Sequence, residues 1–352
     1  MSTRSRLLIG AVALAALHLG VACAGFFAPY DPGAQDRAHP YAPPMRLHFV
    51  EAHSGIHFRP FFYAQELRAG SFDEYEEDRG RAIPVRFFVS GASYRVLGVL
   101  PSRRHLFGGG DAPLYLLGSD GYGRDLFSRV LFGGQVSLLA GLIGAGLTLS
   151  IGLCIGAAAG IWGGWKDEML MRVAELFLAL PWIYLLFAMR AFLPLTVPPL
   201  KAFLLVVVVI GAVGWGRPAR MVRGIVLSAK ERDFVRAARG FGASGGYLLR
   251  RHILPEASSV VLTQAAILVP QFVLAEMTLS FLGLGVPEPV PSWGNMLASL
   301  QHYNVLVSYW WMYLPALAMV PFFVGYLVLA SLLQGSSHAA KIEEARSGVG
   351  CE

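Results

Sequence analysis

The residues with the clearest capacity for chemistry lie in a basic stretch, residues 230–256, between two long apolar runs. Its first basic side chains are Lys230, Arg232, Arg236 and Arg239. Its apolar residues recur at the spacing that makes one stripe along a helix: Phe234, Ala237, Ala238 and Phe241. Such a stretch offers a rigid handle for non-covalent docking of a cytoplasmic partner.

A glycine hinge divides this stretch into two short predicted helices. Gly242 accepts left-handed backbone angles at little cost and can end the first helix. Ser244 can cap the second helix, and Pro255 can stop it. The sequence therefore predicts a compact helix–turn–helix.

Two other groups of residues are candidates for chemistry. Glu276 lies in an apolar run, where a carboxylate is expensive. It is either a residue of a translocation pathway or a helix-packing residue, and we favour packing. Imidazoles suit zinc, nickel or copper, but the four clustered histidines match no standard motif: His39, His48, His53 and His57. We interpret them as ordinary loop residues and expect no metal site.

The sequence lacks the motifs of several enzyme classes. It has no G-x-x-x-x-G-K-[ST] loop, and Gly108-Gly-Gly-Asp lacks the lysine. It also has neither His-Glu-x-x-His nor Gly-x-Ser-x-Gly. We expect no catalytic residue, and if transport is driven by ATP, the ATPase must be another polypeptide.

The composition is that of a membrane protein. Of 352 residues, 55% are hydrophobic and 15% are charged, and the mean hydropathy is +0.52. Apolar runs of about 20 residues predict membrane spans. Six runs with at most one charge are present: Leu7–Ala28, Val136–Trp162, Val173–Met189, Ala202–Trp215, Ala257–Gly285 and Val305–Leu333. We predict six spans, of which Ala202–Trp215 is the shortest.

The positions of Lys and Arg predict the orientation. Arg4 and Arg6 precede the first span, and the loop around residues 230–256 is strongly basic, whereas residues 286–304 contain no Lys or Arg. Both termini and the basic loop are therefore expected inside and residues 286–304 outside. The net charge of +6 follows this topology and does not indicate nucleic-acid binding.

The first span has an alternative interpretation as a cleaved signal peptide. Arg4, Arg6, an apolar core and small residues near Ala22 suit one. We favour an uncleaved span, because the apolar run is long for a signal-peptide core.

Residues 29–118 differ in kind from the rest, being polar, aromatic and rich in Pro and Gly. Residue types near turn formers predict three strands: Arg46–Val50, Arg59–Tyr63 and Pro84–Val89. We expect Phe61–Tyr63 and Phe87–Phe88 to supply a core, with Asp73–Asp78 as a solvated acidic run. The segment is either a docking surface or a passive lid.

The second predicted span contains a ladder of small residues, Gly152, Gly156 and Gly160. This spacing lets helices approach closely. We favour packing within the chain, with packing against a second subunit as the alternative.

The basic stretch resembles the coupling loop of binding-protein-dependent ABC importer permeases. Their signature of Glu-Ala-Ala, a later Gly and a Leu-Pro corresponds to Arg236, Ala237, Ala238, Gly242, Leu254 and Pro255. Arg236 replaces the glutamate. The resemblance implies that loop 229–256 contacts an ATPase through Glu231, Phe234, Arg236, Ala237, Ala238, Gly242, Ala243, Leu254 and Pro255.

Two further segments resemble the C-type permease subunits of dipeptide, oligopeptide and nickel importers. The first is residues 118–139, and the second is residues 275–297. The resemblance covers residues 114 to about 335 and the first span. It implies an all-α polytopic membrane protein with about six transmembrane helices and a β-rich extracytoplasmic insertion between helices 1 and 2.

The segments expected from this resemblance are residues 1–28 (tail and first helix), 29–118 (insertion), 119–335 (permease core) and 336–352 (cytoplasmic tail). The resemblance also implies the partners: a homologous second permease subunit, two ABC ATPase subunits that bind ATP and Mg, an extracytoplasmic substrate-binding protein, and membrane lipid. It implies no cofactor on this chain and a location in the bacterial cytoplasmic (inner) membrane.

The expected function is that of a permease subunit in an ATP-driven importer, forming half of a pathway for peptides. An importer of nickel or another small solute is the alternative within the family. A secondary transporter independent of ATP predicts inverted repeats or several ionisable groups in the spans, which are not evident. A membrane scaffold explains residues 29–118 but not the basic stretch.

Overall fold

The computed structural model describes residues 3–348 except 52–54, 69, 72–73, 97, 111, 180, 193, 195–196, 249–250 and 252–253. It is mostly helical, at 62%. The chain divides into two compact units. We call Met1–Leu14, Leu138–Leu279 and Pro321–Glu352 the helical unit, and Ala15–Ser137 with Ser280–Val320 the mixed unit. The predicted division at residues 28, 118 and 335 stays a prediction.

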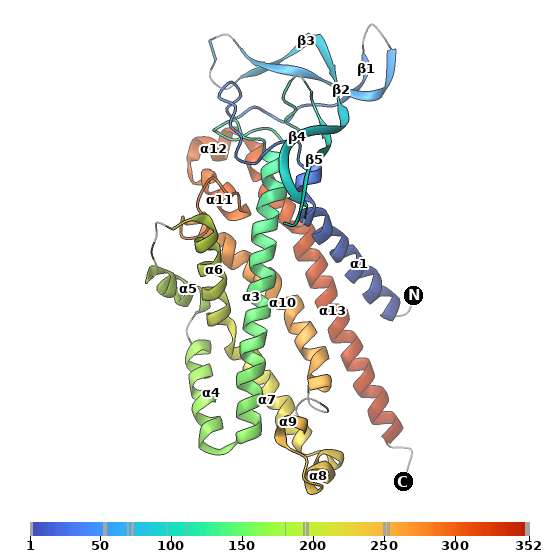
Figure 1. The fold of residues 1–352 in the computed structure, drawn as a ribbon, viewed down its shortest axis with the longest axis vertical. Coiled ribbons are helices and arrows are strands. Elements are labelled where there is room, and N and C mark those ends of the chain that lie inside the picture. The colour runs from blue at the N-terminus through green and yellow to red at the C-terminus, as the bar shows by residue number, and fades with distance from the viewer. Residues whose placement is uncertain are drawn as a thin grey trace. The chain divides into compact units, whose positions relative to one another are not determined.

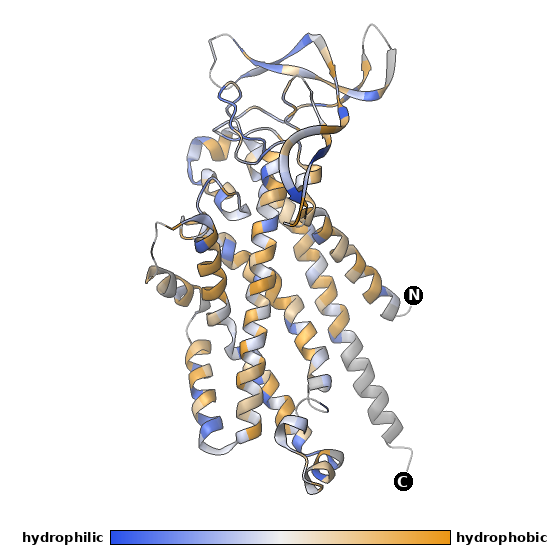
Figure 2. Cartoon of the chain, in the orientation of Figure 1, coloured by the Kyte–Doolittle hydropathy of each residue, from blue (hydrophilic) through white to orange (hydrophobic). Residues whose placement is uncertain are grey.

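Long apolar helices dominate the helical unit (Figures 1 and 2). Its helices are α4 (Gly164–Ala179), α5 (Trp182–Ala191), α6 (Pro199–Gly214), α7 (Gly216–Lys230), α8 (Asp233–Gly240) and α9 (Gly245–Leu248). Four helices have residues in both units: α1 (Thr3–Ala22), α3 (Leu126–Trp162), α10 (Leu254–Phe281) and α13 (Leu314–Gly348).

The count of six spans is not confirmed. Among the described residues, four helices are long and apolar enough to cross a membrane: Ser5–Ala22, Leu126–Trp162, Val260–Phe281 and Trp310–Gly335. A fifth results if α6 and α7, bent by 45°, form one span. The predicted span Val173–Met189 is divided between α4 and α5 near Pro181, because proline removes a helix hydrogen bond.

The ends of three predicted spans also need correction. The first helix ends at Ala22, and a separate short helix α2 (Ala24–Phe27) follows. The span predicted to reach Gly285 ends at Phe281. Residues 305–308, predicted as the start of the last span, belong to a separate short helix, and the apolar span begins at Trp310. Apolar composition alone does not show where a helix stops.

The glycine ladder of α3 packs against α7, which confirms packing within the chain. A Cβ atom added at Gly156 would lie 2.3 Å from the carbonyl oxygen of Ala219. One added at Gly160 would lie 2.7 Å from Val226 Cβ. Both distances are too short for a real contact, so the two backbones approach as closely as they do only because these side chains are absent.

The mixed unit contains two antiparallel sheets (Figure 1). The strands are β1 (His48–Glu51), β2 (Gly55–Leu67), β3 (Tyr75–Pro84), β4 (Arg86–Val96) and β5 (Leu100–Gly108). They pair in the orders β1-β2-β3 and β4-β5. The unit also contains α11 (Trp293–Leu297), α12 (Tyr303–Ser308) and the 3-10 helices Ala298–Gln301 and Trp310–Tyr313.

Two strands lie where no strand was predicted. β3 contains most of the acidic run Asp73–Asp78, and β5 contains Arg103 and Arg104. Such charged sequences have low strand propensity, but pairing with β2 and β4 gives their backbones partners. The strand predicted over Pro84–Val89 is two strands, because β3 ends at Pro84 and β4 begins at Arg86.

The small core of the mixed unit agrees with one predicted aromatic cluster and not with the other. Phe61 and Phe62 are buried, and Phe62 packs with Ile83 and Val85. Phe87 and Phe88 are exposed by 50% and 62%. The prediction of a core at Phe87–Phe88 is therefore wrong, since these residues remain on the surface of β4.

We predict that Gly156→Ala destabilises the protein. The added methyl group meets the Ala219 carbonyl oxygen and must push α3 and α7 apart, which costs about 1–3 kcal/mol. The melting temperature in detergent should fall. Gly146 on the same helix is the matched control, because a Cβ there meets nothing within 4 Å. Gly146→Ala should leave the melting temperature unchanged or raise it, and equal effects of both substitutions would contradict the packing argument.

Candidate functional site

The basic stretch forms a helix–turn–helix that follows α7. Gly242 separates α8 from α9 with a φ of +86°, in the left-handed region. At the start of α9, the Tyr247 backbone N–H donates a hydrogen bond to Ser244 Oγ at 3.3 Å. The predicted hinge and cap are both confirmed.

Pro255 does not stop the second helix. It lies in the first turn of α10, which begins at Leu254. Proline is tolerated there because first-turn N–H groups have no partner within the helix. The prediction is wrong at this residue, since Pro255 helps to begin the next apolar helix.

Two contacts hold this helix–turn–helix on the helical unit. Lys230 Nζ donates a hydrogen bond to the Ile161 carbonyl oxygen at 2.8 Å, near the end of α3. Val235, in the first turn of α8, is buried with 2% exposure. Arg236, at the position of the signature glutamate, forms an exposed ion pair with Glu231, and such a pair adds little stability.

The apolar residues of α8 are divided between two faces. Val235 points inward and Ala238 is half-buried, whereas Ala237 is exposed and Phe241 is 92% exposed. Phe241 directly follows α8, and its backbone N–H donates a hydrogen bond to the Ala237 carbonyl oxygen at 3.1 Å. Ala237 and Phe241 therefore lie on one side of this continued helical turn. Ala238, at the edge of the predicted stripe, borders the buried face of Val235. The side chains of Phe234 and Leu254 lie outside the described residues, and Ala243 is half-buried.

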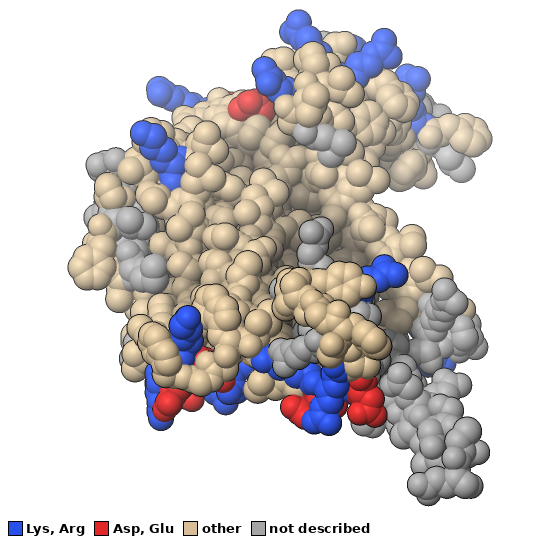
Figure 3. Space-filling view, turned by 60° about the horizontal axis from the view of Figure 1, so that its bottom comes forward, with Lys and Arg blue, Asp and Glu red and all other residues tan. Residues whose placement is uncertain are grey.

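Charged side chains gather along one edge of the helical unit in the lower part of Figure 3, beside a broad surface without charge. The exposed pairs near α7 and in α4 include Arg236 with Glu231 and Arg172 with Glu168. An uncharged surface that ends at a row of charged side chains is expected of a helix bundle in a bilayer.

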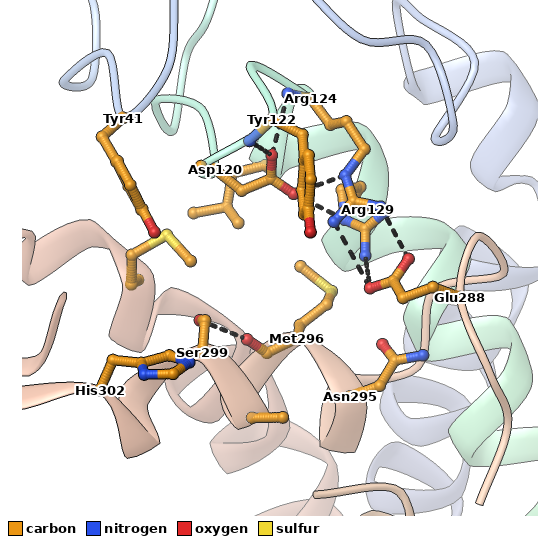
Figure 4. A pocket seen from close by; sticks show the side chains of 14 residues that line it. Tyr41, Asp120, Tyr122, Arg124, Arg129, Glu288, Asn295, Met296, Ser299 and His302 are labelled. Atoms are coloured by element: carbon orange, nitrogen blue, oxygen red, sulfur yellow. Dashed lines mark hydrogen bonds and ion pairs between the residues drawn. The ribbon is translucent and has the colours of Figure 1, made fainter. Parts of the chain in front are cut away.

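The structure also contains a pocket that the sequence did not reveal, in the mixed unit. Its volume is about 530 Å³. Figure 4 shows Arg124, Arg129 and Glu288 linked by hydrogen bonds on one side, with Tyr41 and His302 on the other. Two cations and two carboxylates meet at this wall, because Asp120 completes the group.

Asp120 is the fixed carboxylate of this group. Its Oδ1 accepts hydrogen bonds from the backbone N–H groups of Tyr122 and Arg124 at 2.9 and 3.1 Å. Its Oδ2 lies 2.7 Å from Arg124 Nε and 3.5 Å from Arg129 Nε. All four contacts come from a single turn and the first turn of α3, so this part of the wall is rigid.

Glu288 comes from a distant part of the sequence and bridges both guanidinium groups. Its carboxylate accepts from Arg124 Nη1 at 2.7 Å and from Arg129 Nη2 at 2.8 Å. Burial alone would lower the pKa of Arg124, but the charges of Asp120 and Glu288 raise that pKa above its ordinary value. The cluster thus keeps Arg124 charged.

Glu276 lies in α10 and has no exposed surface. It does not line the cavity of about 250 Å³ in the helical unit, to which α10 contributes Gln264 and Gln271. These two amides are seven residues apart and share one face of the helix. The sequence analysis missed them, although two amides at this spacing in an apolar helix are the signal of a polar face.

The clustered histidines do not converge in the described residues. The His39 ring nitrogens contact Asp36 Oδ2 at 2.7 Å and the Gln65 carbonyl oxygen at 3.1 Å. His48 lies 3.8 Å from Glu77. The side chains of His53 and His57 lie outside the described residues. No group of His, Cys, Asp and Glu suited to a metal ion occurs within the described part of the chain.

Known proteins share much of this sequence. Residues 152–336 match the family described as the binding-protein-dependent transport system inner membrane component. A Brucella ovis protein named as a peptide permease is 38% identical over 66% of this chain and 69% of its own. The oligopeptide transport system permease protein OppC of Bacillus subtilis is 34% identical over 61% of this chain and 65% of its own.

Among solved structures, a chain of the MetNI methionine ABC transporter in an inward-facing conformation aligns with 58% of this chain and 96% of its own. The TM-score is 0.44 and the identity is 20%.

We predict that Asp125, which follows the pocket residue Arg124 in the sequence, makes the free energy of unfolding depend on pH. Burial raises its pKa to about 6, despite the hydrogen bonds that Asp125 accepts from the backbone N–H and the hydroxyl of Ser128. The unfolded pKa is about 3.9, so the folded protein retains a proton that the unfolded chain releases. The contribution of Asp125 to the free energy of unfolding is therefore fully present below pH ~4. It is lost as the pH rises through about 6, and the loss amounts to at most about 3 kcal/mol.

Thermal unfolding of Asp125→Asn in detergent checks this expectation. The variant should lose less stability than the wild type between pH 4.5 and pH 7, because an amide does not titrate. Asp78→Asn, at an exposed carboxylate, should keep the wild-type profile. Parallel profiles for wild type and Asp125→Asn would show that Asp125 does not titrate in this range.

Proposed function

Since the chain belongs to the family of inner-membrane components of binding-protein-dependent transport systems, we propose that it is one permease subunit of an ATP-driven importer of peptides. The family and the apolar helices make it a multi-pass membrane protein. Relatives named as peptide and oligopeptide permeases support peptides as the substrate.

The proposed pathway runs along the face of α10 that carries Gln264 and Gln271. An amide side chain offers both a donor and an acceptor, which suits the alternating N–H and C=O groups of a peptide. Their cavity of about 250 Å³ is then one part of the route, and the remainder is supplied by a second permease subunit. Glu276, which lies farther along the same helix, stays a predicted pathway residue.

Coupling to ATP is proposed to occur through α8. The observation that carries this proposal is the exposed apolar surface formed by Ala237 of α8 and by Phe241, which directly follows the helix. Phe241 is 92% exposed, and covering its side chain with a partner would contribute about 2 kcal/mol of favourable free energy from the removal of apolar surface from water. The hydrogen bond of Lys230, just before α8, and the burial of Val235 support a fixed position for α8. Two separate ATPase subunits would bind the ATP and Mg.

The orientation completes the proposal. With α8 facing the cytoplasm, both termini lie inside, and residues 29–118 lie outside, where a substrate-binding protein delivers the peptide. The strands of the mixed unit then form part of the surface on which that protein or the second permease docks. This arrangement corresponds to the bacterial inner membrane.

We predict that Phe241→Asp releases the ATPase. In the proposed contact with the ATPase, the new carboxylate would be a buried charge without a partner. Co-purification of the ATPase with the tagged permease should therefore fall at least about tenfold, which corresponds to a loss of ~1.4 kcal/mol in binding free energy. Phe58→Asp is the control, because Phe58 is a phenylalanine of β2 that is at least as exposed as Phe241, and its substitution should not affect co-purification. Undiminished co-purification with Phe241→Asp would remove the docking role of α8.

A second prediction concerns the orientation. In a variant without native cysteines, a cysteine at the exposed position Glu76 should react with an impermeant thiol reagent added to intact cells. A cysteine at Ser244 should react only after the cells are opened. The reversed pattern would place α8 outside and exclude coupling through it.

A further inference from the structure

The two carboxylates of the pocket differ in how firmly they are held. Asp120 is 8% exposed and accepts two backbone hydrogen bonds. Glu288 is 44% exposed, and its described hydrogen bonds come from Arg124 and Arg129. A half-exposed side chain held at its tip can rotate away, whereas Asp120 cannot leave without breaking the turn that contains it. Glu288 is therefore the exchangeable partner.

The guanidinium groups require a carboxylate at the position of Glu288. The side chains of Arg124 and Arg129 are only 7% and 1% exposed. When Glu288 leaves, two cations face the single charge of Asp120, and a net charge of +1 remains in a poorly hydrated wall. A buried guanidinium without its partner is strongly unfavourable. An incoming carboxylate can form the same bidentate hydrogen bonds and restore the balance.

The backbone around Glu288 can stay in place during such an exchange. Asn295 Nδ2 donates hydrogen bonds to the carbonyl oxygens of Val286 at 3.1 Å and Val290 at 2.9 Å. These bonds hold the loop on both sides of Glu288. Rotation of one side chain is thus enough to uncover the two arginines, and the receptor remains formed while its occupant changes.

We propose that Arg124 and Arg129 form a carboxylate receptor, occupied by Glu288 at rest, that accepts the C-terminal carboxylate of a small peptide. The choice of a peptide rests on the proposed function. The adjoining volume of about 530 Å³ is a ligand-sized pocket rather than a flat surface, which favours a small molecule over an acidic side chain of a docked protein. Tyr41, Met296 and Met312 supply apolar walls, and Ser299 and His302 supply polar contacts.

Binding of the dipeptide Ala-Phe to the purified full-length chain tests this proposal, measured by isothermal titration calorimetry in detergent. Glu288→Gln removes the competing charge and should raise the affinity for Ala-Phe by about tenfold or more, because the charge-assisted bonds pass to the ligand. The C-terminal amide of the same dipeptide lacks the carboxylate and should show no gain. Glu74→Gln, at an exposed ion pair with Arg68, should behave as wild type.

Equal affinity of wild type and Glu288→Gln for Ala-Phe, or an equal gain for the amide, would overturn the proposal. The melting temperature of each variant verifies that it is folded. If Glu288→Gln does not fold, Glu288→Asp replaces it, because the shorter side chain places its carboxylate farther from the two arginines. Glu288→Asp should raise the affinity for Ala-Phe by a smaller factor, and an unchanged affinity would also contradict the proposal. Co-purification of the ATPase with the wild type is measured in parallel. If the ATPase co-purifies but the expected peptide binding is absent, only the carboxylate receptor is rejected. If the ATPase does not co-purify with the wild type, the proposed function is rejected.

Discussion

The close approach of α3 to α7 is the constraint on which the position of α8, the proposed docking helix, depends. Gly156 and Gly160 leave room for the α7 backbone and for Val226. At the end of the same contact, Lys230 donates to the carbonyl oxygen of Ile161. Because α8 follows α7 after a turn of two residues, the position of its exposed face is set by a helix contact made inside the bundle. The proposed docking surface is thus positioned by a helix contact that two glycines make possible.

Local sequence rules were sufficient for the turn chemistry of the basic stretch. Gly242 and Ser244 have the predicted roles, since a left-handed turn and a helix cap depend on neighbouring residues alone. The same rules were insufficient for Val235 and Pro255. Whether a residue faces inward depends on what α8 packs against, and whether a proline ends one helix or begins the next depends on where the chain turns. The family match to residues 152–336 includes this stretch.

The pocket of the mixed unit could not be predicted from the sequence. Arg124 and Glu288 are 164 residues apart, and no periodicity connects them. Even the charged strands β3 and β5 escaped prediction, because their stability comes from pairing rather than from residue type. The sequence does place Asp120 and Arg124 close enough to form a local ion pair. Only the fold brings Glu288 to the same arginine.

Gly242 is constrained by chirality and not by volume. An added Cβ atom there meets nothing within 4 Å, so space is available for a side chain. The φ of +86° is nevertheless the mirror image of what an L-residue prefers. The hinge between α8 and α9 therefore distinguishes handedness, because the backbone angles that strain L-alanine there are those that D-alanine prefers. The chain uses glycine at this point because it is the only achiral residue the ribosome can supply.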